Sequence, residues 1–393
     1  MMNQDKLYRI REAIRGESLD GWLFSNFKHR DKLSDEILDL PSESTNSRPW
    51  LYVIPIEGEM LRIVSGIEAG MLDSLPGQKI VYTGREEFIS ALAPLAGRRW
   101  GAHFSPMLPV VSYLDFGTAT LLTKAGLDLV PAAGLIQRLK GLLSPSGLES
   151  HKRAAISLYE IVAETWNFVQ EAYRSQKELH EGDVRNAILS GMDRRGIETD
   201  HPPIVASGPH AGDPHYDFAG MGSPIKNGDV IQLDLWAKEK QPLSIYADIS
   251  WLGIYGPEAS PEVEKAFTVL ISARERALDF LNEEFAAKRI PSGASVDEEV
   301  RKILVDAGYS EALRHRTGHG IDTECHGSGA NIDSIEFPDD RLLLDGSCFS
   351  IEPGIYFPTF GLRTEIDLYI QDGKAKISGG ERQFKLLFCD GSQ

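Results

Sequence analysis

The larger C-terminal part of the chain alternates between long amphipathic stretches and short apolar runs. In residues 149–176, apolar side chains recur every three or four positions, which predicts a long helix with one buried face. Similar patterns predict further helices at 182–196, 261–285 and 295–308. Strand-like runs follow these helices at 229–237, 244–256, 347–357 and 361–370. We expect the first two runs, and likewise the last two, to pair as antiparallel hairpins, so an internal duplication is predicted.

The N-terminal part has a different pattern, in which short strand signals alternate with helical ones. The strand-like runs lie at 21–27, 50–56, 60–66 and 79–84, and the helical stretches at 7–14, 86–97 and 114–126. This alternation predicts a small α/β domain. Residues 30–49 are polar and rich in turn formers, which predicts a long loop or lid. Because Pro145 and Gly147 interrupt the pattern, we expect two domains, 1–145 and 146–393.

Composition narrows the classes of function. The 393 residues include 41 Lys and Arg against 58 Asp and Glu, which gives a net charge of −17. We expect such an acidic chain to be repelled by nucleic acid and by anionic membrane surfaces. We find no run of 18 apolar residues and no apolar signal segment, and the three cysteines are too few for a disulfide framework. We therefore expect a cytoplasmic protein without a nucleic-acid or membrane partner.

Four carboxylates fall in or beside the apolar strand patterns. They are Asp234 in VIQLDLW, Asp248 in IYADISW, Glu352 in FSIEPGIY and Glu365 in LRTEIDLY. A carboxylate in a buried strand is costly unless it is paired or bound to a cation. Four that converge are stable together only around multivalent cations. With His319 in RTGHGID they form an oxygen-rich donor set that suits Mn²⁺, Co²⁺ or Fe²⁺.

The number of carboxylates exceeds what one divalent ion needs. We therefore expect two ions bridged by carboxylates and by a water that becomes a nucleophile near neutral pH. Mn²⁺ is the expected ion, with Co²⁺, Fe²⁺ and Zn²⁺ as alternatives. Each residue also has a plainer explanation: Asp234 or Asp248 could lie in a turn or salt bridge, and His319 in an ordinary loop. Asp367 competes with Glu365 on the same strand face.

With the ligand order Asp, Asp, His, Glu, Glu, this sequence resembles the pita-bread metallopeptidases. That family includes aminopeptidase P, prolidase, methionine aminopeptidase and creatinase. The matching stretches are PIVASGPHAGDPHYD, GDVIQLDLWA with YADIS, HRTGHGIDTECH, SIEPGIYF and GLRTEID. The resemblance implies an α+β fold, with a C-terminal pita-bread domain after an N-terminal creatinase-like α/β domain. It implies that Asp248 and Glu365 bridge two ions, that Asp234 holds one of them, and that His319 and Glu352 hold the other.

The resemblance also implies residues that contact or orient the substrate. His215 in DPHYD matches a histidine that lines the substrate pocket, and His326 matches one near the substrate amide. Arg363 matches an arginine that helps to orient the site. Each of these could instead be an ordinary surface residue, and Tyr356 could either reach the site or simply pack.

The implied reaction is hydrolysis of Xaa-Pro peptide bonds, of aminopeptidase P or prolidase type, by a hydroxide that bridges two divalent ions. Glu352 would be both ligand and general base, and His326 would stabilise the oxyanion. We expect a short, proline-containing peptide as substrate and a homodimer as the assembly. One alternative is a metal-dependent hydrolase of a non-peptide amide on the same fold. Another is a non-catalytic binding protein, against which the retention of all five ligands argues.

The sequence departs from the family pattern at a few positions. The spacing of 14 residues from Asp234 to Asp248 is longer than usual. Trp236 and Asp322 stand where glycine is common, and Gly327 stands where the family usually has an acidic residue. No departure removes a ligand, so we expect an effect on substrate specificity more than on chemistry.

Overall fold

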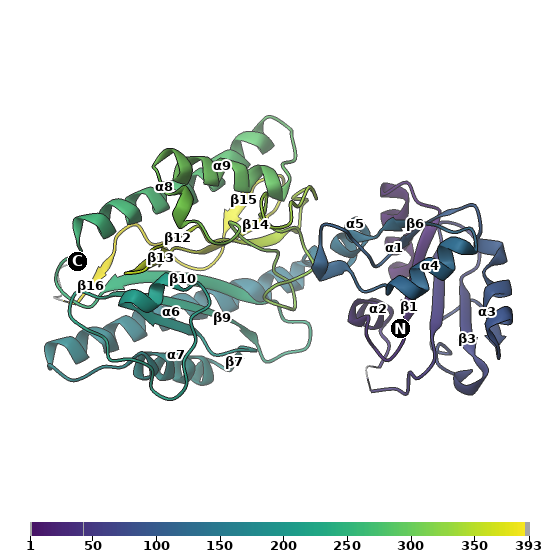
Figure 1. The fold of residues 1–393 in the computed structure, drawn as a ribbon, viewed down its shortest axis with the longest axis horizontal. Helices are drawn as coiled ribbons and strands as arrows, with labels where there is room; N and C mark the ends of the chain where they lie inside the picture. The colour runs from purple at the N-terminus through teal and green to yellow at the C-terminus, as the bar shows by residue number, and fades with distance from the viewer. Residues whose placement is uncertain (1, 42, 390–393) are drawn as a thin grey trace. The chain divides into compact units, whose positions relative to one another are not determined.

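The computed structural model describes residues 2–41 and 43–389, and the chain divides into two units between Lys140 and Gly141 (Figure 1). The N-terminal unit is built on a six-stranded sheet in the order β4-β3-β2-β1-β5-β6. Its strands are β1 (Gly21–Asn26), β2 (Trp50–Pro55), β3 (Leu61–Ser65), β4 (Gln78–Tyr82), β5 (Arg99–Ala102) and β6 (Asp128–Pro131). The β1–β2 and β2–β3 pairs are antiparallel and the other pairs are parallel.

Both faces of this sheet are covered because its central strands are apolar on both sides. On β1, Trp22 and Phe24 pack into one core and Leu23 into another. The first core holds side chains of α1 (Gln4–Gly16), α2 (Lys32–Leu38) and α5 (Ala133–Ile136). The second core holds side chains of α3 (Arg85–Ala91) and α4 (Phe116–Lys124). The N-terminal unit is therefore an α/β sandwich.

The prediction of a long loop over residues 30–49 was wrong in part, because α2 lies within it. Asp31 is the N-cap of this helix, and its side chain accepts a hydrogen bond from the Ser34 N–H at 2.9 Å. Leu33, Ile37 and Leu38 are buried on its inner face. The polar residues around this short apolar pattern concealed it. The four-residue strands β5 and β6 were also missed, since short strands carry little periodicity.

The C-terminal unit contains the predicted helix, helix, hairpin order twice (Figure 1). The first half has α6 (Pro145–Arg174), α7 (Glu181–Arg195), β7 (Ile197–Glu198), β8 (Ile204–Ser207), β9 (Val230–Glu239) and β10 (Ala247–Ile254). The second half has α8 (Pro261–Ala286), α9 (Gly293–Asp306), β11 (Cys348–Ile351), β12 (Gly354–Tyr356), β13 (Gly361–Arg363), β14 (Ile366–Ile370), β15 (Ala375–Ile377) and β16 (Leu387–Phe388). Among the described residues, we find no helix with the length and apolar character that a membrane span requires.

The long first helix of each half begins in the same way. Ser144 is the N-cap of α6 and Ser260 is the N-cap of α8, and a proline follows each serine at the first helical position. Each serine side chain accepts a hydrogen bond from the backbone N–H three residues later. A serine cap and a proline at the first position both favour a helix start, so local chemistry sets these boundaries.

The two faces of strand β9 pack into two different cores, which determines the face on which Asp234 lies. Its odd-numbered residues Ile231, Leu233 and Leu235 pack into the core that also holds side chains of α6 and α7. On the opposite face, Val230 packs into the core formed with α8 and α9. Because side chains alternate along a strand, Asp234 points to this second face. Figure 1 shows the strands of this unit lying between the helix pair α6 and α7 and the helix pair α8 and α9.

The second predicted hairpin forms, but it is interrupted in the middle. Strand β11 pairs with β14, and β12 pairs with β13, both antiparallel, with a break at residues 352–353 and 364–365. Pro353 has no N–H to donate to a ladder. The Glu352 N–H instead donates to the Thr317 carbonyl oxygen at 2.7 Å, and the Glu365 N–H to the Ser250 carbonyl oxygen at 3.2 Å. The break therefore ties Glu352 and Glu365 to neighbouring segments of the unit.

Candidate metal centre

A cavity of about 470 Å³ lies in the C-terminal unit. Every residue that the sequence suggested for metal or substrate lines it: Asp234, Asp248, His215, His319, His326, Glu352, Arg363 and Glu365. The five expected ligands come from the first hairpin, from the break in the second hairpin and from the segment after α9. Residues far apart in the sequence are thus brought to one place.

The register of the first hairpin places both aspartates on the cavity face. Ser250 on β10 lies directly opposite Asp234 on β9, and Asp248 lies two residues before Ser250. Residues at positions i and i+2 of a strand share a face, so all three side chains point the same way. The Ser250 hydroxyl lies 3.0 Å from Asp234 Oδ1 and 2.8 Å from Glu365 Oε2. Ser250 was not recognised from the sequence, although its place two residues after Asp248 was the available signal.

His319 links the two hairpins. Its Nε2 atom lies 3.5 Å from Asp248 Oδ2 and 3.5 Å from Glu352 Oε1. The His319 backbone N–H donates to Ser350 Oγ at 3.1 Å, and the Ser350 N–H donates to the His319 carbonyl oxygen at 2.9 Å. These bonds fasten the His319 segment against β11 and aim the imidazole at the carboxylates.

The donor set fits divalent cations. Among the residues that the structure describes, three groups have ligand atoms all within 4.8 Å of one another: Asp248 with His319 and Cys325, His319 with Glu352 and Glu365, and Asp234 with Asp248 and Glu365. Asp248 Oδ1 and Glu365 Oε1 are buried and have no hydrogen-bond partner in the described part of the chain. An unsatisfied buried carboxylate oxygen is costly, and a bound cation would satisfy it. Asp248, Glu365 and His319 each belong to two of these groups, and the bridging roles of Asp248 and Glu365 stay predictions.

Burial, followed by the charge of neighbouring carboxylates, raises the pKa of Asp248, Glu352 and Glu365. Burial, and after it the charge of Asp234, raise the pKa of Asp248 to about 8. Burial also raises the pKa of Glu352 to about 8. Burial and the charge of Asp248 raise the pKa of Glu365 well above its usual range. A cation between these groups would offset both the burial and the repulsion, so their ionised forms are expected only with positive charge close by.

Arg363 is buried behind the carboxylates and is not a surface residue. Its Nη2 atom forms an ion pair with Asp234 Oδ2, and its Nη1 donates to Tyr356 Oη at 3.2 Å. Tyr356 is itself buried, and its hydroxyl lies 2.7 Å from His315 Nε2. Tyr356 therefore packs beneath the cavity wall and contacts the site through Arg363 and His315. Asp367, the competitor of Glu365, instead accepts a hydrogen bond from the Asp248 backbone N–H at 2.8 Å.

The two remaining histidines lie on the cavity wall. The His326 ring centroid is 4.3 Å from that of His319, and the charge of His319, followed by burial, lowers the pKa of His326 to about 3. His326 is therefore neutral at physiological pH and has one N–H to donate. His215 is exposed to the cavity, and its backbone N–H donates to Asp213 Oδ1 at 3.1 Å. Their contacts with a substrate stay predictions.

One of the unusual residues, Trp236, lines the cavity, whereas Asp322 and Gly327 together shape a loop beside it. Trp236 lies opposite Asp248 in the hairpin, lines the cavity and donates its Nε1–H to Asp200 Oδ1 at 2.7 Å. Asp322 and Gly327 form one structural feature, because a Cβ on Gly327 would lie 2.7 Å from Asp322 Cγ. Asp322 Oδ2 accepts a hydrogen bond from the Ser328 N–H at 2.7 Å, which closes this loop. Because that Cβ would also lie 2.7 Å from the backbone nitrogen of Asp322, this loop requires a glycine at 327.

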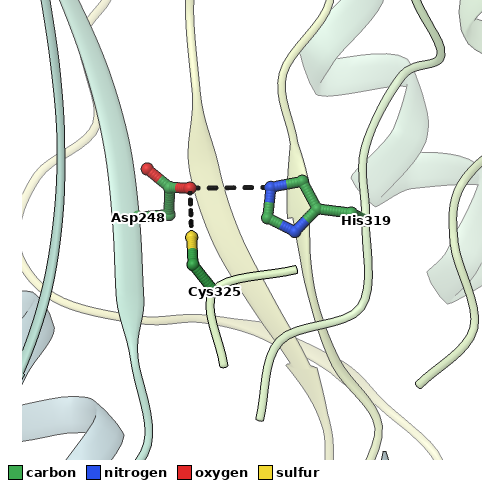
Figure 2. A group of neighbouring side chains, drawn as sticks. All are labelled: Asp248, His319 and Cys325. Atoms are coloured by element: carbon green, nitrogen blue, oxygen red, sulfur yellow. Dashed lines mark hydrogen bonds and ion pairs between the residues drawn. The ribbon is translucent and has the colours of Figure 1, made fainter. Parts of the chain in front are cut away.

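Two further residues at the cavity escaped the sequence analysis. Arg316 lines the cavity, and its guanidinium has no hydrogen-bond or ion-pair partner among the described residues. Burial and, as the second-largest cause, the charge of Arg316 lower the pKa of His319 to about 3. Cys325 also lines the cavity, with Sγ 3.0 Å from Asp248 Oδ2 (Figure 2). Both lie in HRTGHGIDTECH, so proximity to His319 was the available signal.

Gly318 is required beside His319 because β11 passes very close. A Cβ on Gly318 would lie 2.0 Å from the Ser350 carbonyl oxygen. We expect Gly318→Ala to push the His319 segment away from β11, lowering Mn²⁺ affinity by about tenfold or more. We also expect it to reduce the free energy of unfolding by about 1–3 kcal/mol. Calorimetric Mn²⁺ titration and urea unfolding measure the two effects.

Gly70→Ala is the matched control, because its nearest neighbouring atom is 3.7 Å from the added Cβ. Unchanged metal affinity in Gly318→Ala would show that the close approach does not hold His319 in place.

The chain is similar to known proteins both in sequence and in structure. Residues 149–372 match the model of metallopeptidase family M24. The chain is 31% identical over 217 residues to an Xaa-Pro dipeptidase of Lactobacillus delbrueckii subsp. lactis, in an alignment of 53% of this chain and 55% of that protein. It is 26% identical over 264 residues to the probable dipeptidase PepE of Mycobacterium tuberculosis, covering 63% of this chain and 61% of that protein.

The sequence alignments thus span little more than half the length of these curated relatives. The structural likeness extends further. The crystal structure of dipeptidase PepE from Mycobacterium ulcerans superposes with a TM-score of 0.74 and 22% identity, covering 98% of this chain and 97% of that one. This confirms the predicted α+β pita-bread fold with its N-terminal α/β domain.

Proposed function

This chain belongs to metallopeptidase family M24, and from that membership we propose that it hydrolyses short Xaa-Pro peptides with two divalent cations. The ligands would be Asp234, Asp248, His319, Glu352 and Glu365. The observation that carries the proposal is their convergence around buried carboxylate oxygens that have no partner in the described chain. The Lactobacillus relative, named an Xaa-Pro dipeptidase, supports the choice of bond.

The cations, when bound, would acidify a water molecule and polarise the scissile carbonyl. Glu352 accepts the proton of the attacking water and passes it to the leaving nitrogen. His326, neutral and with an N–H to donate, hydrogen-bonds the oxygen on which negative charge develops. His215 binds the carbonyl or carboxylate end of the substrate. Arg363, which pairs with Asp234 and donates to Tyr356, holds both side chains in position.

Selectivity for proline would come from the shape of the cavity. A proline residue has a fixed φ and no N–H, so a rigid wall can select it without hydrogen bonds. Trp236, held by Asp200, supplies such a wall beside Asp248. We propose Mn²⁺ as the ion. The homodimer and the cytoplasmic location stay predictions.

We propose dipeptidase rather than aminopeptidase action because of Arg316. A guanidinium in the cavity that has no partner among the described residues suits the free carboxylate of a dipeptide. We expect Arg316→Gln to raise the KM for Ala-Pro by roughly 10- to 100-fold, the equivalent of one charged hydrogen bond. The KM for Ala-Pro amide should change little, because that substrate lacks the carboxylate. Steady-state kinetics with both substrates measures the difference.

Arg314→Gln is the matched control, since Arg314 is exposed and does not line the cavity. An equal loss for the acid and the amide in Arg316→Gln would contradict a role in carboxylate recognition.

The experiment that tests the proposed function uses metal-stripped protein with Ala-Pro, Ala-Pro-Ala and Ala-Ala, with and without Mn²⁺ or Co²⁺. We expect metal-dependent cleavage of Ala-Pro, weaker cleavage of Ala-Pro-Ala and little cleavage of Ala-Ala. No cleavage despite two bound ions per chain would overturn the peptidase proposal. It would favour a non-peptide amide substrate, whereas failure to bind ions would favour a non-catalytic binding protein.

A further inference from the structure

Two donor atoms converge on the same oxygen of Asp248. Cys325 Sγ lies 3.0 Å from Asp248 Oδ2, and His319 Nε2 lies 3.5 Å from it (Figure 2). All three side chains are buried, with exposed fractions of 5% or less. Their ligand atoms lie within 4.8 Å of one another. An oxygen, a nitrogen and a sulfur donor are therefore close enough to share one ion, given metal–ligand bonds of about 2.0–2.3 Å.

A hydrogen bond from the thiol does not by itself satisfy this carboxylate. Asp248 Oδ1 is buried and has no partner among the described residues, so the group retains an unused acceptor beside the sulfur. The other two cysteines have different surroundings. The Cys348 sulfur lies 3.5 Å from His151 Nε2, and neither Cys348 nor Cys389 lines the cavity. Cys325 alone, among these three, faces the metal ligands.

We propose that the Cys325 sulfur is a further ligand of the ion held by His319, so that one half of the centre has mixed nitrogen, oxygen and sulfur donors. This inference rests on the metal centre of the proposed function. Binding replaces the S–H bond with a sulfur–metal bond, and the thiol proton leaves to solvent through the cavity. Thiolate donors favour Zn²⁺ and Co²⁺ over Mn²⁺, so this inference restricts the proposal of Mn²⁺ to the ion held by Asp234. The ion position held by Asp234 keeps only oxygen donors. The two positions should therefore prefer different metals.

The test is the absorption spectrum of the full chain loaded with Co²⁺. A thiolate ligand gives a sulfur-to-cobalt charge-transfer band in the near ultraviolet, which oxygen and nitrogen donors do not give. We expect this band in the unaltered protein and its loss in Cys325→Ser and Cys325→Val. Cys348→Ala, which removes a buried thiol away from the cavity, should keep the band.

Competition between ions gives a second readout that does not depend on activity. We expect Cys325→Val to lower the affinity for Zn²⁺ by about tenfold or more, as loss of a group that supports a metal site commonly does. The affinity for Mn²⁺ should fall much less. Counting bound ions per chain shows that each variant still forms the centre.

The outcomes separate this inference from the proposed function. Two bound Co²⁺ ions without a charge-transfer band, together with unchanged ion preference in Cys325→Val, would overturn the sulfur ligand and leave the metal centre standing. A band that persists in both Cys325 variants would equally overturn it. Absence of Co²⁺ binding in the unaltered protein would overturn the metal centre and the sulfur ligand together.

Discussion

Asp248→Asn and Glu365→Gln are each expected to lower kcat/KM for Ala-Pro by about a thousandfold or more. Each carboxylate belongs to two groups of converging ligand atoms, so its loss weakens both ion positions. The amide variants keep the volume of the side chain, which separates loss of a ligand from loss of packing. Kinetics at saturating Mn²⁺ and elemental analysis for bound metal measure the effect, with fewer than two ions per chain expected.

Glu258→Gln is the matched control for these variants, because Glu258 is exposed and lies outside the cavity. It should leave activity and metal content unchanged. Full activity in Asp248→Asn or in Glu365→Gln would sink the two-ion interpretation.

Removing the metal is expected to destabilise the protein strongly. In the centre, burial and mutual repulsion raise the pKa of several carboxyl groups, and a cation relieves both. At a thousand times its Kd, a ligand of the native state adds about 4 kcal/mol of stability. For a unit of this size, that corresponds to a rise of roughly 10 °C in Tm. Thermal unfolding of stripped protein with and without Mn²⁺ measures this rise.

The rise should shrink in Asp248→Asn, because that variant retains fewer ligands for the ion. Identical melting curves with and without Mn²⁺, and with and without Co²⁺, would show that no cation binds the folded protein tightly.

Long periodic elements were predictable from the sequence, whereas interruptions were not. The helices α6 and α8 show the 3.6-residue pattern over many turns, so each was located within a few residues. The break at Glu352 depends on where the backbone N–H groups of Glu352 and Glu365 find partners in other segments. Helix α2 was missed because its apolar pattern covers only two turns in a polar stretch.

The candidate ligands were predictable because a carboxylate in an apolar strand is conspicuous. Asp234 and Asp248 contradict the pattern of their strands, and only a charged or bound partner explains them. Cys325 and Arg316 lack such a contrast, since both lie in a polar loop. Their relevance appears only when the loop folds back, with the Gly327 N–H donating to the Gly320 carbonyl oxygen at 2.7 Å. Such placement depends on the tertiary structure.

The most direct measurement is a titration of metal-stripped protein with Mn²⁺ in which hydrolysis of Ala-Pro and bound metal are followed together. If the five ligands hold two ions that act on the peptide bond, activity should be absent at the start and should reach its maximum at two equivalents per chain. Hydrolysis at the full rate by the stripped protein, or a maximum reached with only one ion bound, would contradict the two-ion centre.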